Sequence, residues 1–408
     1  MSHRTFPRIR AVVSRVLFGL FTALYFVNSS AAESTKDAPA DIGTVLTPII
    51  MRAKIPGMAV VVLQGNRIIA QGVAGVRKMG STEPITLDDQ FELGSCTKAM
   101  TTTLVAMLVE EGKLSWDTSL AEIFCNAGGS IAPDWKAVTI RQLLDQRAGL
   151  TGNHPFDFFA SADRTKGDLP EQRRKFALKL LARTPDIPPG KFVYSAANFI
   201  LAGAVLEKIT GQTWEELMLE RLYGPLGIST GGFGPPGAAS QVTQPWGHGH
   251  RRLFYVPMPG SGCTPFDPGS ASADYPPAAG PAGMAHMSIT DWAKFVAVYL
   301  RADPANPHRQ VTLLKADTFA QMQEPGEKEY AGGWFIDTKP WAKGPRPSDT
   351  GRVFFHAGDN GRWSTVVWVA PEIDFAMLIA CNRGGMGKPV DEIAGALLRF
   401  APKPFVIR

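Results

Sequence analysis

Residues 58–75 read MAVVVLQGNRIIAQGVAG, which is two apolar runs joined by a short polar turn. The first run is Met58–Leu63, the second is Arg67–Gly75, and Gln64-Gly65-Asn66 separates them. Apolar runs of this length on either side of a glycine-containing turn are typical of a β-hairpin. The hairpin supplies the N-terminal strands of a sheet, and the other strands of that sheet must come from elsewhere in the chain.

Strand-like runs return only near the C-terminus. They are Gly333–Asp337, Val353–His356, Ser364–Ala370 and Phe375–Cys381. The middle of the chain instead has apolar residues at helical spacing, in Thr101–Glu111, Ile140–Asp145, Gln172–Ala182, Ala196–Ile209, Thr213–Leu222 and Ile289–Leu300. Two more helices are predicted near the ends, at Ile42–Ala53 and Asp391–Phe400.

This distribution predicts an α+β fold. One antiparallel sheet is formed by both chain ends, is flanked by the terminal helices, and carries a mostly helical inserted subdomain. We expect the domain to span residues 33–408, with a sheet subdomain at about 41–94 plus 330–403 and the helical insertion at about 95–329. A ligand site is expected in a cleft between the two parts.

The first 32 residues are typical of a secretory signal peptide. Four arginines precede the apolar run Val16–Val27, and the small residues of Asn28–Ala32 follow it. A charged start, a short apolar centre and a small-residue exit are the three parts of such a signal. The apolar run has 12 residues, whereas a membrane-spanning helix needs about 20. We therefore expect cleavage before Glu33 and a periplasmic or secreted protein with no stable membrane span; an uncleaved anchor is the alternative.

Charge and cysteine content exclude several functional classes. The 408 residues carry 42 basic and 37 acidic side chains, and without the four arginines of the first 32 residues the basic count is 38. A nucleic-acid-binding protein needs a basic face, so no nucleic-acid partner is expected. No glycine-rich phosphate loop is present and the cysteines lack metal-binding spacing, so no cofactor and no metal are expected. Buried free thiols or at most one disulfide are expected for the four cysteines, Cys96, Cys125, Cys263 and Cys381.

Residues 91–98 read FELGSCTK and lead into an apolar helix. Ser95 should lie at the first turn, with Lys98 three residues on and on the same helix face. A serine hydroxyl is a poor nucleophile near neutral pH and needs a nearby base. A lysine serves as that base only when burial lowers its pKa. The free N–H groups of the helix start can also stabilise an oxyanion. The alternative role of Ser95 is a helix N-cap.

The chain resembles the serine β-lactamase and penicillin-binding-protein superfamily, in particular the class C β-lactamase-related group with D-aminopeptidases and esterases. The resemblance extends from Ile42 to Phe400, and its motifs occur in order. They are residues 55–58 (IPGM), 91–98 (FELGSCTK), 138–144 (VTIRQLL) with 148–150 (AGL), 192–195 (FVYS), 332–334 (GGW) and 356–358 (HAG).

The resemblance implies a catalytic set of Ser95, Lys98, Tyr194 and His356. Ser95 would attack a carbonyl and become acylated, and Lys98 would hold or accept its proton. Tyr194, with a phenol acidified by Lys98, would act as a base coupled to the lysine. The oxyanion would lie against the Ser95 amide and the Asp359 amide, just after Gly358.

Two positions depart from the family pattern. Ala196 stands where the family usually has an asparagine that contacts the substrate's amide, and Asn198 should point elsewhere. His356 replaces the lysine of a Lys-Thr-Gly motif, and a histidine is only partly charged near pH 7. The histidine form resembles the esterase and aminopeptidase branches.

These features predict an exported serine hydrolase that forms an acyl-enzyme on Ser95 and hydrolyses an ester or amide. The partner would be a small molecule or peptide, such as a β-lactam or a peptidoglycan-like D-peptide. Two alternatives remain open: a true class C-like β-lactamase, and a non-catalytic protein that binds cell-wall peptides or penicillin.

Overall fold

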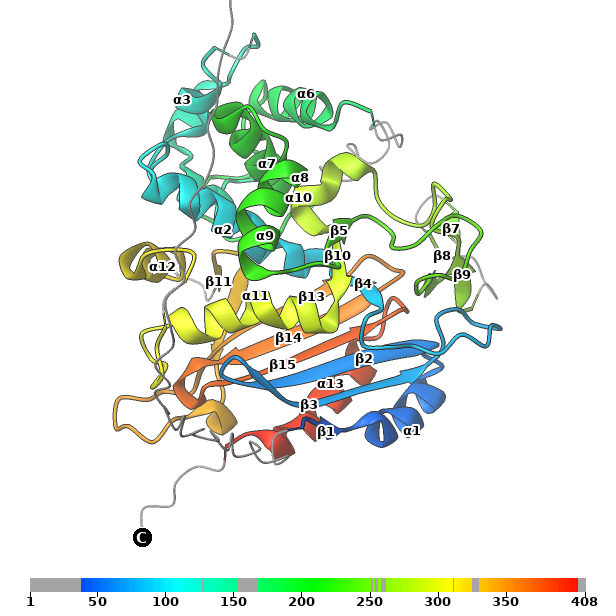
Figure 1. Cartoon of the computed structure of the whole chain (residues 1–408). Coiled ribbons are helices and arrows are strands. Elements are labelled where there is room, and N and C mark those ends of the chain that lie inside the picture. Colours follow the sequence, from blue (N-terminus) through cyan, green and yellow to red (C-terminus); the bar gives the residue numbers. More distant parts are fainter. Residues whose placement is uncertain are drawn as a thin grey trace, which may run out of the picture. The chain divides into compact units, whose positions relative to one another are not determined.

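An eight-stranded sheet forms the centre of the protein (Figure 1). The structure is a computed structural model that describes residues 38–402 except 127, 153–166, 251, 254–255, 258–261, 311 and 325–329. The predicted signal peptide therefore lies outside the described residues. All the elements named below belong to one unit, Pro39–Arg408.

The strand order in the sheet is β1-β3-β2-β15-β14-β13-β12-β11. Strands from both chain ends meet where β2 pairs with β15, so the prediction of one sheet built from both ends is confirmed. Every neighbouring pair is antiparallel except β1 with β3, which is parallel. The strands are β1 (Ala40–Asp41), β2 (Gly57–Gln64), β3 (Arg67–Gly75), β11 (Tyr330–Ala331), β12 (Trp334–Thr338), β13 (Arg352–Asp359), β14 (Ser364–Ala370) and β15 (Phe375–Cys381).

Both faces of the sheet are covered by helices. On one face, α1 (Gly43–Ala53) packs on β2 and β3, and α13 (Gly387–Leu397) packs on β14 and β15. On the other face, α11 (Ile289–Ala302) packs on β2, β14 and β15 (Figure 1). The side chains of β2 alternate between two buried clusters, Met58, Val60 and Val62 on the first face and Ala59, Val61 and Leu63 on the second. A strand buried on both faces reads as a continuous apolar run, which explains the sequence of residues 58–63.

The middle of the chain is mostly helical, as predicted. Its helices are α2 (Thr97–Glu110), α3 (Leu120–Phe124), α4 (Ile140–Leu144), α6 (Leu169–Leu181), α7 (Ala196–Thr210), α8 (Trp214–Leu217) with the π-helix Met218–Tyr223, α9 (Gly224–Leu226), α10 (Gly280–Gly283) and α12 (Ala316–Met322). Short 3-10 turns are η1 (Gly94–Cys96), η2 (Pro133–Ala137), η4 (Pro277–Ala279), η5 (Pro340–Ala342), η6 (Pro371–Ile373) and η7 (Leu398–Phe400).

The same region holds three small sheets that the sequence pattern did not predict. The largest has the order β4-β10-β5, and the others pair β6 with β9 and β7 with β8. Their strands are β4 (Gln90–Glu92), β5 (Gly232–Phe233), β6 (Gly247–Gly249), β7 (Arg252–Leu253), β8 (Val256–Pro257), β9 (Thr264–Phe266) and β10 (Ala285–Ser288). Each strand is two to four residues long, which is too short for a periodic pattern.

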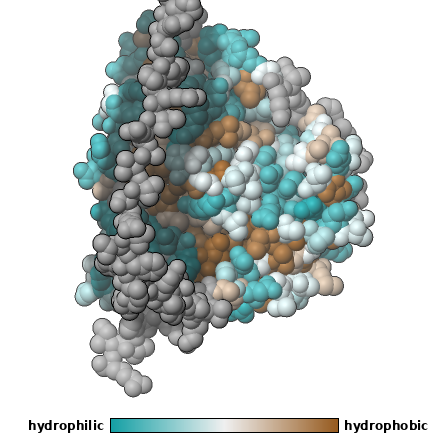
Figure 2. Space-filling view, in the orientation of Figure 1, coloured by the Kyte–Doolittle hydropathy of each residue, from teal (hydrophilic) through white to brown (hydrophobic). Residues whose placement is uncertain are grey.

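The described residues include neither a membrane-spanning helix nor a disulfide bond. No helix there has the length and apolar character needed to cross a bilayer. Figure 2 shows hydrophobic residues as separate groups among hydrophilic ones on the face in view. All four cysteines are free; two of them, Cys96 and Cys381, are buried.

Candidate active site

Ser95 lies in a tight turn that packs directly against β13. The turn is η1, which continues into α2. Gly94 has φ +52°, a conformation that side-chain-bearing residues rarely adopt. A Cβ on Gly94 would lie 3.0 Å from the Gly358 Cα, and a Cβ on Gly358 would lie 2.1 Å from the Leu93 carbonyl oxygen. The two glycines therefore allow the backbone before the serine to touch the backbone of the strand.

Hydrogen bonds hold this turn on both sides. The Thr365 hydroxyl of β14 donates to the Leu93 carbonyl at 2.9 Å, and the Leu93 amide donates to the Ala285 carbonyl at 2.8 Å. The Ala285 amide in turn donates to the Thr97 hydroxyl at 3.1 Å. The large sheet, the small β4-β10-β5 sheet and α2 thus fix the position of Ser95.

Lys98 is buried directly behind Ser95. Only 1% of its surface is exposed. Its Nζ donates to the Ser95 Oγ at 2.9 Å and to the Ala282 carbonyl at 2.6 Å. Burial removes water from the amine and lowers the pKa of Lys98 from 10.5 to about 7. The sequence predicted the contact with Ser95 but not the one with Ala282, because a backbone carbonyl leaves no trace in residue type.

The segment that carries Ala282 is itself anchored to α2. The Thr101 hydroxyl donates to the Pro281 carbonyl at 2.8 Å, and the Trp214 Nε1 donates to the Thr101 hydroxyl at 3.1 Å. Both Trp214 and Thr101 are fully buried. These contacts orient the Ala282 carbonyl toward the Lys98 Nζ.

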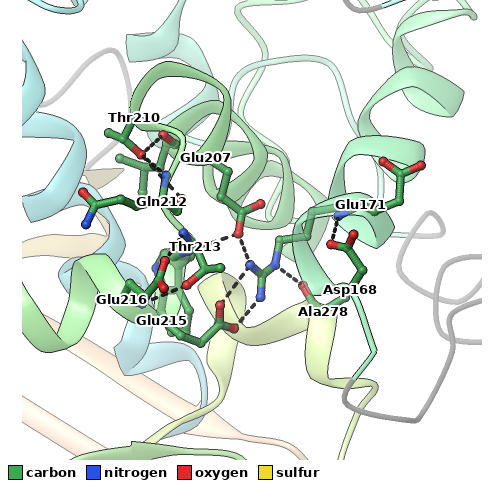
Figure 3. A network of polar contacts seen from close by, with 12 residues as sticks. Asp168, Glu171, Glu207, Thr210, Gln212, Thr213, Glu215, Glu216 and Ala278 are labelled. Carbon is green, nitrogen blue, oxygen red and sulfur yellow. Dashed lines mark hydrogen bonds and ion pairs between the residues drawn. The ribbon is translucent and has the colours of Figure 1, made fainter.

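A buried arginine ties the same segment to three helices. Figure 3 shows Glu207 of α7, Glu215 of α8 and the Ala278 carbonyl of η4 converging on one guanidinium. That guanidinium belongs to Arg173 of α6, which is 0% exposed and donates to Ala278 at 3.0 Å. Burial raises the pKa of Glu207 to about 7 despite the opposing charge of Arg173. Removing one partner of a buried ion pair leaves an uncompensated charge and destabilises the fold. This network therefore stabilises the packing of the helices in the insertion.

Tyr194 precedes the N-cap of α7 and faces Lys98. The Lys98 Nζ lies 5.1 Å from the centre of the tyrosine ring. Burial raises the pKa of the Tyr194 phenol, and the contact with Ser95 offsets this only in part. The direction is opposite to the acidified phenol that the resemblance implied. Near neutral pH, the free base of the pair is therefore the Lys98 amine, and Tyr194 is a phenol.

His356 is buried in an aromatic box. Its ring centre lies 6.0 Å from that of Tyr194, 6.2 Å from that of Tyr330 and 5.4 Å from that of Phe335. The Nδ1 atom lies 2.8 Å from the Ala357 carbonyl and so carries the hydrogen. Desolvation, together with the charge of Lys98, lowers the pKa of His356 to about 3. The ring is neutral at physiological pH and does not replace the cation of a Lys-Thr-Gly motif.

The end of β13 places the two predicted oxyanion residues beside the serine turn. A Cβ on Gly94 would lie 3.1 Å from the Asp359 amide nitrogen, so that amide borders the turn. Pairing of β13 with β12 ends at Phe355, which leaves residues 356–359 beyond the paired part of β12. Ala357 and Asp359 are exposed there. All six predicted residues, Ser95, Lys98, Tyr194, His356, Gly358 and Asp359, thus converge on one site.

No side-chain amide stands at the position where the family usually has an asparagine. Ala196 is the first residue of α7, while Asn198 is buried and donates to the Gln146 side chain and the Ser195 carbonyl. Asn198 therefore points away from the lysine, as predicted. Among the described residues, no group of three or more His, Cys, Asp or Glu side chains could hold a metal ion.

Comparisons with known proteins identify a family and several relatives. The family model described as Beta-lactamase matches residues 37–400. Penicillin-binding protein 4 of Amycolatopsis lactamdurans is 26% identical over 335 residues, which cover 81% of each chain. Unguisins hydrolase ungD' of Aspergillus campestris is 24% identical over 364 residues, and the match spans 87% of this chain but only 63% of that hydrolase.

Solved structures share the fold. The octameric penicillin-binding protein homologue from Pyrococcus abyssi aligns with a TM-score of 0.67 at 20% identity, covering 88% of this chain and 76% of that one. D-amino acid amidase from Ochrobactrum anthropi SV3, complexed with L-phenylalanine amide, aligns with a TM-score of 0.65 at 18% identity, covering 88% and 97%. At these identities the likeness is one of architecture.

Proposed function

Because the chain belongs to the β-lactamase family, we propose that it is an exported serine hydrolase that cleaves an ester or amide through an acyl-enzyme on Ser95. One observation carries the proposal: the Lys98 Nζ lies 2.9 Å from the Ser95 Oγ, and burial lowers the pKa of that lysine to about 7. With that pKa, about half of the amine is unprotonated at pH 7, and this form can take the proton of an attacking hydroxyl.

Acylation begins with transfer of the Ser95 proton to the Lys98 amine. The Ser95 Oγ then bonds to the substrate carbonyl carbon, and the carbonyl oxygen becomes an oxyanion. The amides of Ser95 and Asp359 are placed to donate to that oxyanion. When the tetrahedral intermediate collapses, the bond to the leaving group breaks, and the proton passes from Lys98 through the Tyr194 phenol to the leaving group.

Deacylation repeats the sequence with water as the nucleophile. Lys98 is again a free amine after the leaving group has taken its proton, so it can accept a proton from the incoming water. The water oxygen bonds to the acyl carbon, the ester bond to Ser95 breaks, and the proton returns to the Ser95 Oγ. The free acid leaves and the site is restored.

Two probes separate the proposal from its alternatives. The purified protein is incubated with p-nitrophenyl acetate and with a fluorescent penicillin. Ester turnover that exceeds the rate of the Ser95→Ala variant supports the hydrolase. A stable penicillin adduct without any turnover would favour the non-catalytic binding protein, a reading that the similarity to penicillin-binding protein 4 also supports.

Ester hydrolysis is expected to exceed β-lactam hydrolysis. A β-lactam is held by its carboxylate and its side-chain amide, but here His356 is neutral and Ala196 offers no hydrogen bond. A lost hydrogen bond to a charged group costs roughly 1.5–3 kcal/mol and a neutral one about 0.5–1.5 kcal/mol. At about 1.4 kcal/mol per decade, the two contacts together are worth on the order of 10- to 1,000-fold in kcat/KM.

The measurement is the ratio of kcat/KM for p-nitrophenyl butyrate and nitrocefin. Ala196→Asn restores the amide contact and should raise kcat/KM for nitrocefin by about two- to tenfold while leaving the ester value unchanged. His356 is not replaced by lysine in this test, because a cation in the aromatic box would be buried without a partner. A wild-type enzyme that already prefers nitrocefin contradicts the argument.

Export is tested by the N-terminus of the mature protein. We expect export because the chain has an arginine-rich start, the apolar run Val16–Val27 and small residues before Glu33. We expect protein recovered outside the cytoplasm to begin near Glu33, as read by N-terminal sequencing. An intact Met1 in a membrane fraction would instead support an uncleaved anchor.

A further inference from the structure

Two carboxyl groups face each other behind the serine turn. Glu92 is the last residue of β4, three residues before Ser95, and 0% of it is exposed. Asp274 lies in the segment before η4, and its side chain contacts that of Glu92. The Asp274 Oδ2 and both Oε atoms of Glu92 are buried. Neither Oε of Glu92 has a donor in normal hydrogen-bond geometry among the described residues, and the nearby Asn360 side chain acts to lower the pKa of Glu92.

A proton between two neighbouring buried carboxylate oxygens removes the repulsion between them. Both are acceptors when ionised, and like charges at this range disfavour double ionisation. Burial accordingly raises the pKa of Glu92 well above 4.5, and the charge of Asp274 raises that pKa further. Burial also raises the pKa of Asp274.

The pair is connected to the oxyanion segment through Asn360. The Asn360 Nδ2 donates to the Asp274 Oδ1 at 3.1 Å. The Asn360 Oδ1 accepts the amides of Arg362 and Trp363, each at 3.0 Å, and so closes the turn between β13 and β14. Asn360 follows Asp359 directly, so these hydrogen bonds lie next to the residue whose amide is the predicted oxyanion donor.

Few other charged or titratable groups face the pair. From the β13–β14 turn, the charge of Arg362 lowers the pKa of both carboxyls, and its Nε donates to Ser272 at 3.1 Å. From β10, His286 lies opposite Glu92 in the register and bonds through Nδ1 to the Gly234 carbonyl. From the end of β13, Asp359 accepts the Ser364 hydroxyl and the Gly385 amide instead. η1 contributes no charged group to this side.

We propose that Glu92 and Asp274 share a single proton that holds Asp274 and Asn360 in place and thereby positions the Asp359 amide for catalysis. Glu92 is fixed on a strand, whereas Asp274 borders a cavity of about 660 Å³ that Phe233, Tyr275 and Met284 also line. Loss of the shared proton at alkaline pH leaves two carboxylates in contact. Asp274 then swings into the cavity, Asn360 loses its partner and the oxyanion amide loses its alignment. Both residues are positioning residues for the reaction proposed above, and the inference rests on that reaction.

The test compares the pH profiles of the wild type and of Glu92→Gln. The glutamine amide donates permanently to Asp274 and mimics the protonated pair. The wild type is expected to lose kcat by about tenfold per pH unit beyond the point where the proton leaves, while Glu92→Gln keeps its kcat for p-nitrophenyl butyrate to pH 10. Asp274→Asn should behave in the same way, because its amide can donate to Glu92. Glu92→Ala, which cannot hold Asp274, should lose at least tenfold in kcat at every pH.

A matched control is Asp303→Asn. Asp303 is 0% exposed, also has a raised pKa, and pairs with Arg352 at the opposite end of β13. This variant should keep the alkaline decline of the wild type. A wild-type profile that stays flat to pH 10, or a Glu92→Gln profile that declines like the wild type, overturns the proposal.

A second readout does not depend on activity. A folded carboxyl with a raised pKa keeps a proton that the unfolded chain releases above about pH 4.3. Its contribution to stability is therefore complete below that pH and is lost as pH rises through the folded pKa. The melting temperature of the wild type should fall with pH more steeply than that of Glu92→Gln. Equal slopes overturn the shared proton, whereas absent ester turnover with unequal slopes counts against the proposed function alone.

Discussion

Replacing Ser95 by alanine is expected to lower kcat/KM for p-nitrophenyl butyrate by about 10⁴-fold or more, the scale seen when a nucleophile is removed from a coupled unit. The hydroxyl is half-buried, accepts a hydrogen bond from the Lys98 Nζ at 2.9 Å and contacts the Tyr194 side chain. Its loss leaves the glycine contacts of the turn unchanged, so the melting temperature should stay within a few degrees. Mass spectrometry should find the acyl adduct on the peptide that contains Ser95 in the wild type and no adduct in the variant.

Ser195→Ala is the matched control for removing a hydroxyl near the site. Ser195 follows Tyr194, caps α7 through the Ala197 amide and donates to the Thr151 carbonyl. Loss of an N-cap costs about 1 kcal/mol of stability, so this variant should be less stable yet keep its activity within about tenfold. Turnover that survives in Ser95→Ala would remove Ser95 from the nucleophile's role.

Lys98→Met is expected to lower kcat/KM by about 10³-fold or more and to stabilise the fold. The amine is 1% exposed, and burial lowers its pKa to about 7. An unfolded lysine keeps its proton up to about pH 10.4. Below pH 7 the buried amine is protonated and lowers the free energy of unfolding of the wild type by its full amount. This destabilisation decreases as pH rises toward 10. The free energy of unfolding of Lys98→Met at pH 6 should exceed that of the wild type by on the order of 2–4 kcal/mol.

Chemical unfolding at pH 6 and at pH 10 measures this difference, which should shrink at the higher pH. The wild-type kcat/KM should also fall about tenfold per pH unit below pH 7, where Lys98 is protonated. Lys175→Met, at a lysine whose side chain is 72% exposed, should change neither quantity. A double variant Ser95→Ala/Lys98→Met that is far less active than either single variant would contradict the coupled unit.

The sequence predicted the central strands of the sheet most accurately. The bounds of β14 and β15 match the predicted runs, because both strands are nearly continuous apolar stretches that end at polar or small residues. The short strands β1, β4 and β11 were missed. β4 pairs with a strand far along the chain, Phe91 with Met287 of β10, and such a pairing has no local pattern. β11 pairs with the neighbouring β12 but has only two residues, too few for a periodic pattern.

The sequence predicted Ser95 at the first turn of a helix that carries Lys98, but the apolar helical pattern itself was recognised only from Thr101, whereas α2 begins at Thr97. Thr97 and Lys98 are polar residues that read as surface, yet both are buried because they hold the serine turn and its base. The nucleophile and its lysine were identified because their side chains carry the chemistry. The contact of Lys98 with the Ala282 carbonyl was not identified, because a backbone atom has no signal in residue type. The contact of Glu92 with Asp274 was not identified either, because it spans 182 residues and forms only in the folded chain.

The meeting of both chain ends in one sheet also sets an order of events during synthesis. β2 and β3 emerge early, but β2 has its second neighbour, β15, only after about 300 more residues. At roughly 5–20 residues per second, a ribosome needs roughly 15–60 s to supply them. Throughout that interval one edge of an apolar hairpin is unpaired and able to pair with another chain. We therefore expect the nascent hairpin to need protection from aggregation until its last strands are made, and truncation before β15 should yield an aggregating fragment rather than a smaller folded domain.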